Sequence, residues 1–246
     1  YKRQGLENDS VFQTGSQQRT EYGGKFRRTV ELVRSGAIGE LKKIRVCVGA
    51  PPKTCDLPTE PIPEGIDWDA WLGPAPKRGF NKILCPDDVH NHFPAWRNYR
   101  EYCNGKLADI GAHHFDIGQW AMDADDTGPV KILPPDEGES ELKLIYANGV
   151  EVIHGRDPEW NGGTIFYGTE GTIWVDRGPW KSDPESLIKE YEASVTLHQP
   201  RNHHEDWLDC IHSGEMPMAH AEAGHRTASI CPVSYTHLRA HETDYY

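Results

Sequence analysis

Residues 104–120 carry an acid and a histidine at a spacing that suits proton transfer. The segment reads NGKLADIGAHHFDIGQW, and if it is helical from about Leu107, then Asp109, His113 and Asp116 share one helix face. A carboxylate orients an imidazole and sets which ring nitrogen carries the proton, so the pair suits general acid–base catalysis. The same spacing also occurs in solvated surface pairs, and that alternative stays open.

The opposite side of this predicted helix is apolar and would bury it against a core. Its apolar residues are Leu107, Ile110, Phe115, Ile117 and Trp120. An amphipathic helix of this kind can hold its polar side chains in fixed directions.

Three residues that precede this helix could form a wall for a sugar. Trp96 and Tyr99 offer flat rings for C–H faces, and Arg97 offers a planar donor fork for hydroxyls or a carboxylate. Structural packing is an equal alternative for Trp96. His90 and His92, with His113 and His114, could instead be interpreted as a metal cluster, but their spacing is not that of a firm ligand set, so no metal is predicted.

Composition limits the function classes. The chain has 246 residues, 37% of them hydrophobic and 26% charged, and a net charge of −12, which is typical of a globular protein without a nucleic-acid partner. No apolar run is long enough to predict a membrane span. The six cysteines form no Cys-x-x-Cys pair and read as ordinary thiols.

The segment GKLADIGAHHFDIGQW resembles the second signature of the glucose-fructose oxidoreductase / inositol dehydrogenase / rhizopine-catabolism (Gfo/Idh/MocA) family. In that family the helix carries a catalytic Asp and His beside the nicotinamide of NAD or NADP. The resemblance therefore implies that Asp109 and His113 are catalytic and that His114 adds a hydrogen bond to a neighbouring substrate hydroxyl. Relatives usually have two or three glycines before the helix, whereas Cys103 and Asn104 precede Gly105 here.

A second resemblance lies near the start of the chain. VFQTGSQQRT…ELVRSGAIGELKKIRV is similar to the family's exit from its dinucleotide-binding domain. By that match Gln17 and Arg19 would lie near the nicotinamide or the substrate. A helix-start pair bound to backbone is an equally good interpretation.

The phosphate-binding part of such an enzyme is not found in the sequence. No GxGxxG follows a predicted strand, and the family's Glu-Lys-Pro tripeptide with its catalytic Lys does not occur. We expect both upstream of Tyr1, so this chain alone should bind a dinucleotide poorly. The resemblance implies a division into residues 1–36, a remnant of the N-terminal dinucleotide-binding domain, and residues 37–231, a C-terminal substrate and oligomerisation domain.

After Trp120 the predicted elements change from helices to strands. Five strands are expected near residues 129–133, 141–146, 150–154, 164–167 and 172–175, and an earlier one at 41–50. With helices at 22–35, 107–120 and 202–212, the expected fold is α+β: a largely antiparallel open sheet with helices on one face. It would be preceded by the last strand and helix of a Rossmann domain, with the strand at 11–16.

The end of the chain is atypical. Val233–Thr243 (VSYTHLRAHET) looks like a translated sequencing adapter, so residues 232–246 are expected to be a non-native tail outside the fold.

These observations predict a fragment of an NAD(P)-dependent oxidoreductase acting on a sugar, a sugar derivative or a cyclitol, assembled as a homo-oligomer through its sheet. The alternatives are a non-catalytic carbohydrate-binding or scaffolding module and a metal-dependent hydrolase. Cytoplasmic and exported locations both stay open, since some relatives are exported folded with their cofactor.

Overall fold

The computed structural model describes residues 2–87, 93–135 and 141–243, which fall into two compact units. The larger unit comprises Tyr1–Val48 and Gly111–Tyr246, and the smaller comprises Gly49–Ile110. We describe each unit by itself.

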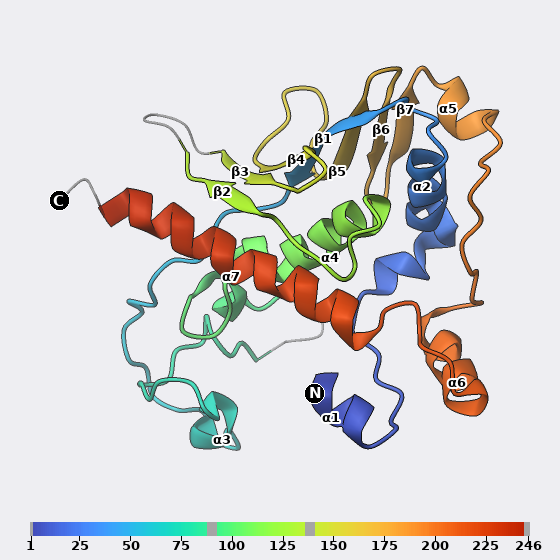
Figure 1. The fold of residues 1–246 in the computed structure, drawn as a ribbon. Helices are drawn as coiled ribbons and strands as arrows, with labels where there is room; N and C mark the ends of the chain where they lie inside the picture. The colour runs from blue at the N-terminus through green and yellow to red at the C-terminus, as the bar shows by residue number, and fades with distance from the viewer. Residues whose placement is uncertain (1, 88–92, 136–140, 244–246) are drawn as a thin grey trace. The chain divides into compact units, whose positions relative to one another are not determined.

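The larger unit contains one seven-stranded sheet (Figure 1). Its strands are β1 (Leu41–Cys47), β2 (Lys131–Leu133), β3 (Leu142–Ile145), β4 (Glu151–His154), β5 (Gly163–Gly168), β6 (Thr172–Val175) and β7 (Trp180–Asp183). They run in the order β2-β3-β4-β1-β5-β6-β7, and β1–β4 is parallel while the other neighbouring pairs are antiparallel. The predicted class, a largely antiparallel open sheet, is confirmed.

Alternation along β1 gives the sheet two different faces. Ile44 and Val46 are buried on one face, and Lys43 and Arg45 point to the other. Ile44 lies opposite Val152 of β4 and Phe166 of β5 in register, so the buried face continues across three strands.

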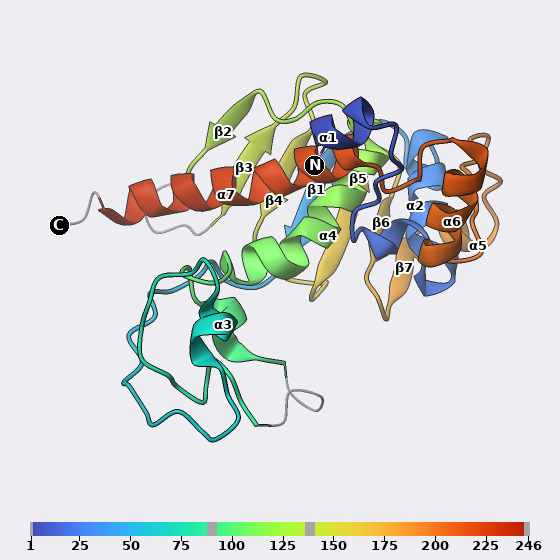
Figure 2. The same cartoon turned by 90° about the horizontal axis from the view of Figure 1, so that it is seen from below.

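Helices cover this buried face (Figures 1 and 2). The helices there are α2 (Lys25–Arg34), α4 (Gly105–Ala121) and α7 (Ala221–Thr243). A Cβ built on Gly118 of α4 would lie 3.6 Å from the Ile44 side chain, so the helix backbone packs directly on β1. The indole of Trp180 on β7 donates to the Thr29 hydroxyl of α2 at 2.9 Å. Helices on one face of the sheet were predicted, and the larger unit has them.

The remaining elements of the larger unit are short, except for helix α6. They are α1 (Lys2–Glu7), η1 (Gln17–Arg19), η2 (Tyr22–Gly24), α5 (Ser186–Lys189) and α6 (His203–Ser213). Asn202 caps α6 by accepting hydrogen bonds from the backbone N–H groups of His204 and Glu205. No helix of the described residues is both long and apolar enough to cross a lipid bilayer.

The smaller unit is mostly loops around an aromatic core. Its helices are α3 (Trp68–Leu72) and η3 (Ala95–Asn98), together with the first residues of α4. The buried core residues are Trp68, Leu72, Phe80, Leu84 and Tyr99. Trp68 stacks on Trp71 with ring centroids 4.5 Å apart, as expected of a pair that fixes this loop to its core.

Three elements differ from the sequence prediction. The strand expected at 11–16 is reduced to an isolated β-bridge between Gln13 and His220. Strand β7 was not predicted, because WKSD carries a single apolar residue. Helix α7 continues through Val233–Thr243, the segment expected outside the fold, and buries Ser234 and Leu238.

A buried cation holds several of these segments together. Arg19 of η1 is 1% exposed, and all five of its N–H groups donate: two to Asp116, two to Asp125 and one to the carbonyl of Met218, at 2.7–3.2 Å. Asp116 belongs to α4 and also accepts from the hydroxyl of Thr227 on α7. The pair therefore ties η1, α4 and α7 to one point.

The electrostatics of this cluster favour full ionisation. Burial alone lowers the pKa of Arg19, but Asp116 and Asp125 more than offset it and the net pKa is raised. Asp116 is fully buried, so removing its cation would leave a carboxylate without charge compensation inside the protein.

We predict that Arg19→Met lowers the free energy of unfolding by about 3–5 kcal/mol, because it strands the buried charge of Asp116. Urea denaturation followed by circular dichroism measures this. Lys42→Met is the matched control, since Lys42 pairs with Glu40 at an exposed position and should matter little. Equal effects of the two substitutions would contradict the assignment.

Candidate active site

Helix α4 carries both predicted catalytic residues without interruption. It begins at Gly105, two residues before the predicted start. Gly105 has φ +68°, and a Cβ there would lie 2.5 Å from the Pro52 nitrogen, so only glycine fits. Asp109 and His113 are thus four residues apart in one helix, as predicted.

His113 lines an open pocket of about 550 Å³ in the larger unit. Its other walls are Gln17 of η1, Glu21, Tyr22 and Arg177, which follows β6. Amide, carboxylate, phenol, imidazole and guanidinium groups converge here, and such a set can hydrogen-bond several hydroxyls of a polyol. The structure therefore brings the predicted residues His113 and Gln17 together.

A buried amide joins two walls of this pocket. Gln18 is 1% exposed, its Nε2 donates to the His113 carbonyl at 3.1 Å, and its Oε1 accepts from Arg177 Nε at 3.1 Å. Because both ends of the amide are used, Gln18 fixes the spacing between the helix backbone at His113 and the guanidinium of Arg177.

Asp109 lies in the smaller unit, paired with Arg97. Arg97 Nη1 donates to Asp109 Oδ1 at 2.7 Å. The guanidinium of Arg97 is held over the rings of Phe93 and Trp96, at 4.2 and 4.7 Å. Asp109 Oδ2 is buried and has no hydrogen-bond partner among the described residues, so one oxygen of this carboxylate is left to accept a proton or a hydrogen bond.

The predicted sugar wall is only partly supported by this geometry. Tyr99 is 3% exposed and belongs to the aromatic core of the smaller unit, which favours a packing role over the predicted contact with a substrate. Trp96 packs against the same core, which is the structural alternative, and Arg97 donates one hydrogen bond, from Nη1, to Asp109 Oδ1. Arg97 therefore acts as a positioning partner of the carboxylate.

His114 was expected to bind a substrate hydroxyl, but its ring is buried and engaged. Nδ1 lies 3.0 Å from the Thr164 hydroxyl and Nε2 lies 3.5 Å from Asp176 Oδ1. With 2% of its surface exposed, the ring cannot reach a ligand. It instead holds the residue that precedes Arg177.

Arg19 was expected near the nicotinamide or the substrate, and its hydrogen bonds favour a structural role instead. All of its donors are directed at this chain's own carboxylates and carbonyl, as described above, so none is left for a nucleotide. Asp116, the second acid of the polar helix face, is one of the two carboxylates that pair with Arg19.

A metal centre has no support from the part of the chain that is described. There, no three His, Cys, Asp or Glu side chains gather as a ligand set. His90 and His92, which the metal interpretation needs, lie outside the described residues.

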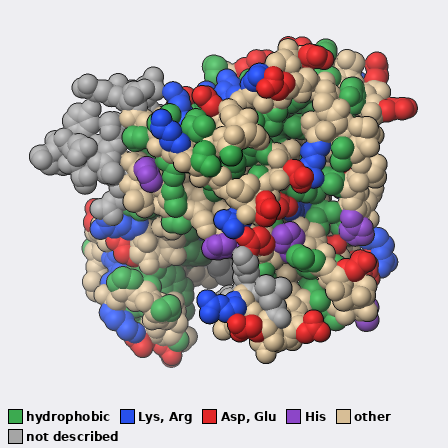
Figure 3. Space-filling model, viewed as in Figure 1, with side chains coloured by type: hydrophobic (Ala, Val, Ile, Leu, Met, Phe, Trp, Pro, Cys, Tyr) green, Lys and Arg blue, Asp and Glu red, His purple; other side chains and the backbone are tan. Residues whose placement is uncertain are grey.

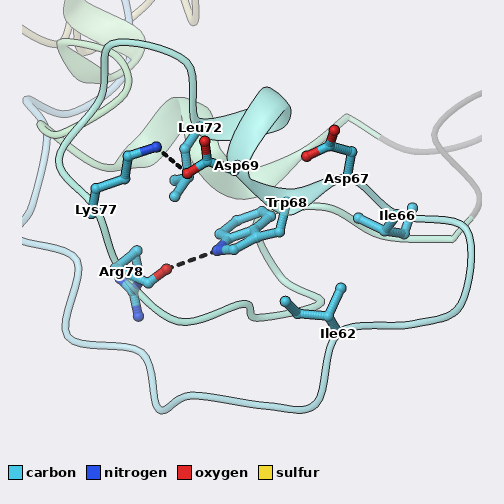
Figure 4. Close-up of a pocket in the computed structure, with 8 residues that line it drawn as sticks. All are labelled: Ile62, Ile66, Asp67, Trp68, Asp69, Leu72, Lys77 and Arg78. Atoms are coloured by element: carbon cyan, nitrogen blue, oxygen red, sulfur yellow. Dashed lines mark hydrogen bonds and ion pairs between the residues drawn. The ribbon is translucent and has the colours of Figure 1, made fainter.

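The smaller unit has a second, wider pocket of about 830 Å³ (Figure 4). Ile62, Ile66 and Leu72 surround the Trp68 indole, whose Nε1 donates to the Arg78 carbonyl at 2.8 Å. The charged residues at its rim, Asp69 and Lys77, pair with each other. With its polar groups already paired, this pocket is a weaker candidate for catalysis than the one at His113.

Surface charge is mixed rather than segregated on the face shown in Figure 3. Acidic and basic side chains there are interspersed with neutral and hydrophobic ones.

The chain belongs to the Gfo/Idh/MocA oxidoreductase family. Residues 51–245 match the family's "Oxidoreductase family, C-terminal alpha/beta domain". The family resemblance drawn from the helix signature is thereby confirmed. No curated protein sequence matches the chain significantly.

Solved structures share the fold at low sequence identity. Aldose-aldose oxidoreductase from Caulobacter crescentus, complexed with glycerol, is 14% identical with a TM-score of 0.53, and 96% of this chain covers 64% of it. WlbA dehydrogenase from Bordetella pertussis, in complex with NADH and UDP-GlcNAcA, is 14% identical with a TM-score of 0.55, with 97% and 65% covered. An NAD-binding protein from Listeria innocua is 14% identical with a TM-score of 0.56, with 96% and 64% covered. This chain therefore spans less than two thirds of the length of these relatives.

The residues that sequence reasoning missed are Gln18, Glu21, Tyr22 and Arg177. Nothing in their local pattern marks Gln18 or Tyr22, and Tyr22 has φ +59°, an uncommon conformation for a bulky residue. Arg177 follows the strand predicted at 172–175, and the alternation that predicts a strand says nothing about the residue after it.

We predict that His114→Leu raises the pKa of Asp176. Burial by itself raises the pKa of Asp176. Hydrogen bonds from the His114 ring and the Arg177 backbone N–H lower it by more than burial raises it, so the net pKa lies below the ordinary aspartate value. A depressed folded pKa contributes stability that is present above pH ~3.9 and is lost as pH falls through the folded pKa. In His114→Leu that contribution shrinks and acid unfolding begins at higher pH.

A carbon-detected NMR titration of the Asp176 carboxyl measures this shift. His114→Gln keeps a hydrogen-bond donor and should give a smaller change. An unaltered Asp176 titration in His114→Leu would show that the ring does not hold the carboxylate.

Proposed function

We propose that the chain is the substrate-binding part of an NAD(P)-dependent oxidoreductase that acts on a sugar, a sugar derivative or a cyclitol. The observation that carries the proposal is His113, which lines a polar pocket and lies on the same helix as Asp109. Membership of the family supplies the reaction class.

The reaction needs two transfers from a secondary alcohol. The carbon loses a hydride, the oxygen loses a proton, and a C=O bond forms from the electron pair of the O–H bond. A bound nicotinamide ring supplies the acceptor for the hydride. His113 takes the hydroxyl proton as general base, and returns it when the reaction runs towards the alcohol.

Asp109 provides the carboxylate that assists this proton transfer. Arg97 donates a charge-assisted hydrogen bond to Oδ1 of this carboxylate, while Oδ2 has no partner among the described residues. That oxygen is therefore suited to accept an N–H from a catalytic imidazole or lysine.

Most of the cofactor contacts would come from residues outside this chain. The residues around His113 suit the reacting end of a nicotinamide and a polyol, with Gln17 as an amide neighbour. The sequence has no GxGxxG loop, the element that usually holds the pyrophosphate of a dinucleotide. We therefore expect weak dinucleotide binding by the chain alone, and NAD and NADP are not distinguished by its residues.

Relatives with the same fold make a polyol a reasonable substrate class. The Caulobacter protein is an aldose-aldose oxidoreductase, and the Bordetella dehydrogenase binds NADH and UDP-GlcNAcA. The convergence of hydrogen-bonding groups on the His113 pocket fits ligands of that chemistry.

We predict that His113→Ala and Asp109→Asn each lower turnover by about 10²–10⁴ in the parent polypeptide that includes a dinucleotide-binding domain. The loss reflects missing proton transfer. Reduction of NAD⁺ or NADP⁺, followed at 340 nm with a panel of polyols, measures it.

Asp69→Asn is the matched control for these variants, since it removes an exposed carboxylate outside the proposed site. Full activity in both His113→Ala and Asp109→Asn would contradict the assignment of the site. Sugar binding with no oxidation of any polyol would instead favour a non-catalytic carbohydrate-binding module.

We further propose that the chain self-associates through the outer face of its sheet. Helices α2, α4 and α7 lie on the opposite face (Figures 1 and 2). The outer face presents half-buried side chains such as Ile145, Tyr167 and Trp174 among lysines, a surface suited to a subunit contact.

We predict a mass of at least two chains by light scattering of the purified protein. Ile145→Glu should shift it towards the monomer, because it places a charge in the proposed contact. Met216→Glu is the control, at a side chain that is already 69% exposed. A monomeric unmodified chain at micromolar concentration would refute this contact.

A further inference from the structure

Arg177 presents an oriented and unused donor fork to the His113 pocket. Its Nε donates to Gln18 Oε1 at 3.1 Å, and its guanidinium lies 5.4 Å from the centroid of the Tyr22 ring. These two contacts set the plane of the group. Its two terminal nitrogens have no hydrogen bond or ion pair with any described residue.

Other arginines near this region are already occupied. Arg19 donates all of its N–H groups inside the protein, and Arg27 pairs with Glu31 and Gln199. Of these arginines, Arg177 is the one whose terminal N–H groups lie at the His113 pocket without a partner among the described residues.

The backbone of Arg177 is fixed from both sides. Its N–H donates to Asp176 Oδ1 at 2.7 Å, and that carboxylate lies against the buried ring of His114. Its carbonyl accepts from Lys25 Nζ at 2.5 Å. These contacts fix the backbone of this exposed residue, and the bond from Nε to Gln18 restricts its side chain, which lowers the loss of side-chain freedom on binding a ligand.

The ring beneath the guanidinium is held in a costly conformation. Tyr22 has φ +59°, which is sterically unfavourable for a residue of its size, and its ring packs edge-on against Phe26 at 5.7 Å. Strain of this kind persists only where the surrounding structure imposes it and often accompanies a binding site. Here it places an aromatic face under Arg177.

The acid in the same pocket does not neutralise this fork. Glu21 Oε1 accepts from the backbone N–H of His203 at 2.9 Å, and no ion pair joins Glu21 to Arg177 among the described residues. The pocket therefore offers a hydroxyl-binding carboxylate and, separately, an anion-binding guanidinium.

We infer that the terminal nitrogens of Arg177 bind a carboxylate on the substrate, so the polyol accepted here is a sugar acid rather than a neutral sugar. Paired N–H groups of a guanidinium match the two oxygens of a carboxylate, and charge-assisted hydrogen bonds are stronger than neutral ones. This inference rests on the proposed function, because it names the substrate class of the same pocket.

Calorimetric titration of the purified chain tests the inference with D-glucuronate, D-glucose and D-glucose 6-phosphate as probes at one ionic strength. We expect glucuronate to bind at least tenfold more tightly than glucose. Arg177→Gln should abolish that preference, and Arg177→Lys should retain part of it because it keeps the charge without the fork. Arg156→Gln is the matched control, since it removes an exposed arginine outside the pocket.

Equal binding of glucuronate and glucose, undetectable glucuronate binding, or a preference that survives Arg177→Gln would each overturn the inference. Tighter binding of the phosphate than of glucuronate, lost in Arg177→Gln, would overturn the carboxylate assignment. The proposed function is tested separately: polyol oxidation by the parent polypeptide that depends on His113 would stand even where these probes show no preference for an acid.

Discussion

The larger unit depends on the burial of Arg19 between Asp116 and Asp125. Buried ion pairs contribute little net stability, but they are specific, because a misplaced partner leaves an uncompensated charge. Asp116 therefore fixes the rotation of α4 about its axis. Residues three apart on a helix differ by about 60° in direction, so directing Asp116 at η1 also directs His113 towards the segment around η1. Gln17 and Tyr22 of that segment are the neighbours of His113 in the pocket.

The segment that carries Arg19 thus has two roles. Arg19 is the buried anchor, while the adjacent Gln18 connects the backbone of His113 to Arg177. Three consecutive residues with positive φ, Tyr22, Gly23 and Gly24, lie within five residues after Arg19. A chain so constrained can hold strained dihedral angles, since relaxing Tyr22 would disturb the hydrogen bonds of its neighbours.

Periodicity predicted the helix of Asp109 and His113 and six of the seven strands, because those patterns are local. The roles of Arg19, His114 and Tyr99 could not be predicted in this way. Each is a polar or amphipathic residue whose function depends on whether it is buried, and burial is decided by distant partners such as Asp125 and Thr164. Strand β7 was missed for a related reason: its single apolar residue, Trp180, is stabilised by a hydrogen bond to α2 rather than by alternation.

The position of Arg177 also depends on contacts between residues that are far apart in the sequence. Thr164 of β5 touches His114 of α4 and pairs in register with Val175 of β6. Arg177 follows two residues later, so the register of this hairpin determines whether its guanidinium reaches the pocket. A slip of one residue would turn the end of β6 to the other face of the sheet and remove both Asp176 from His114 and Arg177 from Gln18. The register of β5 and β6 against the buried ring of His114 therefore determines whether Arg177 reaches the pocket. The residues next to Arg177 in the sequence give no sign of this.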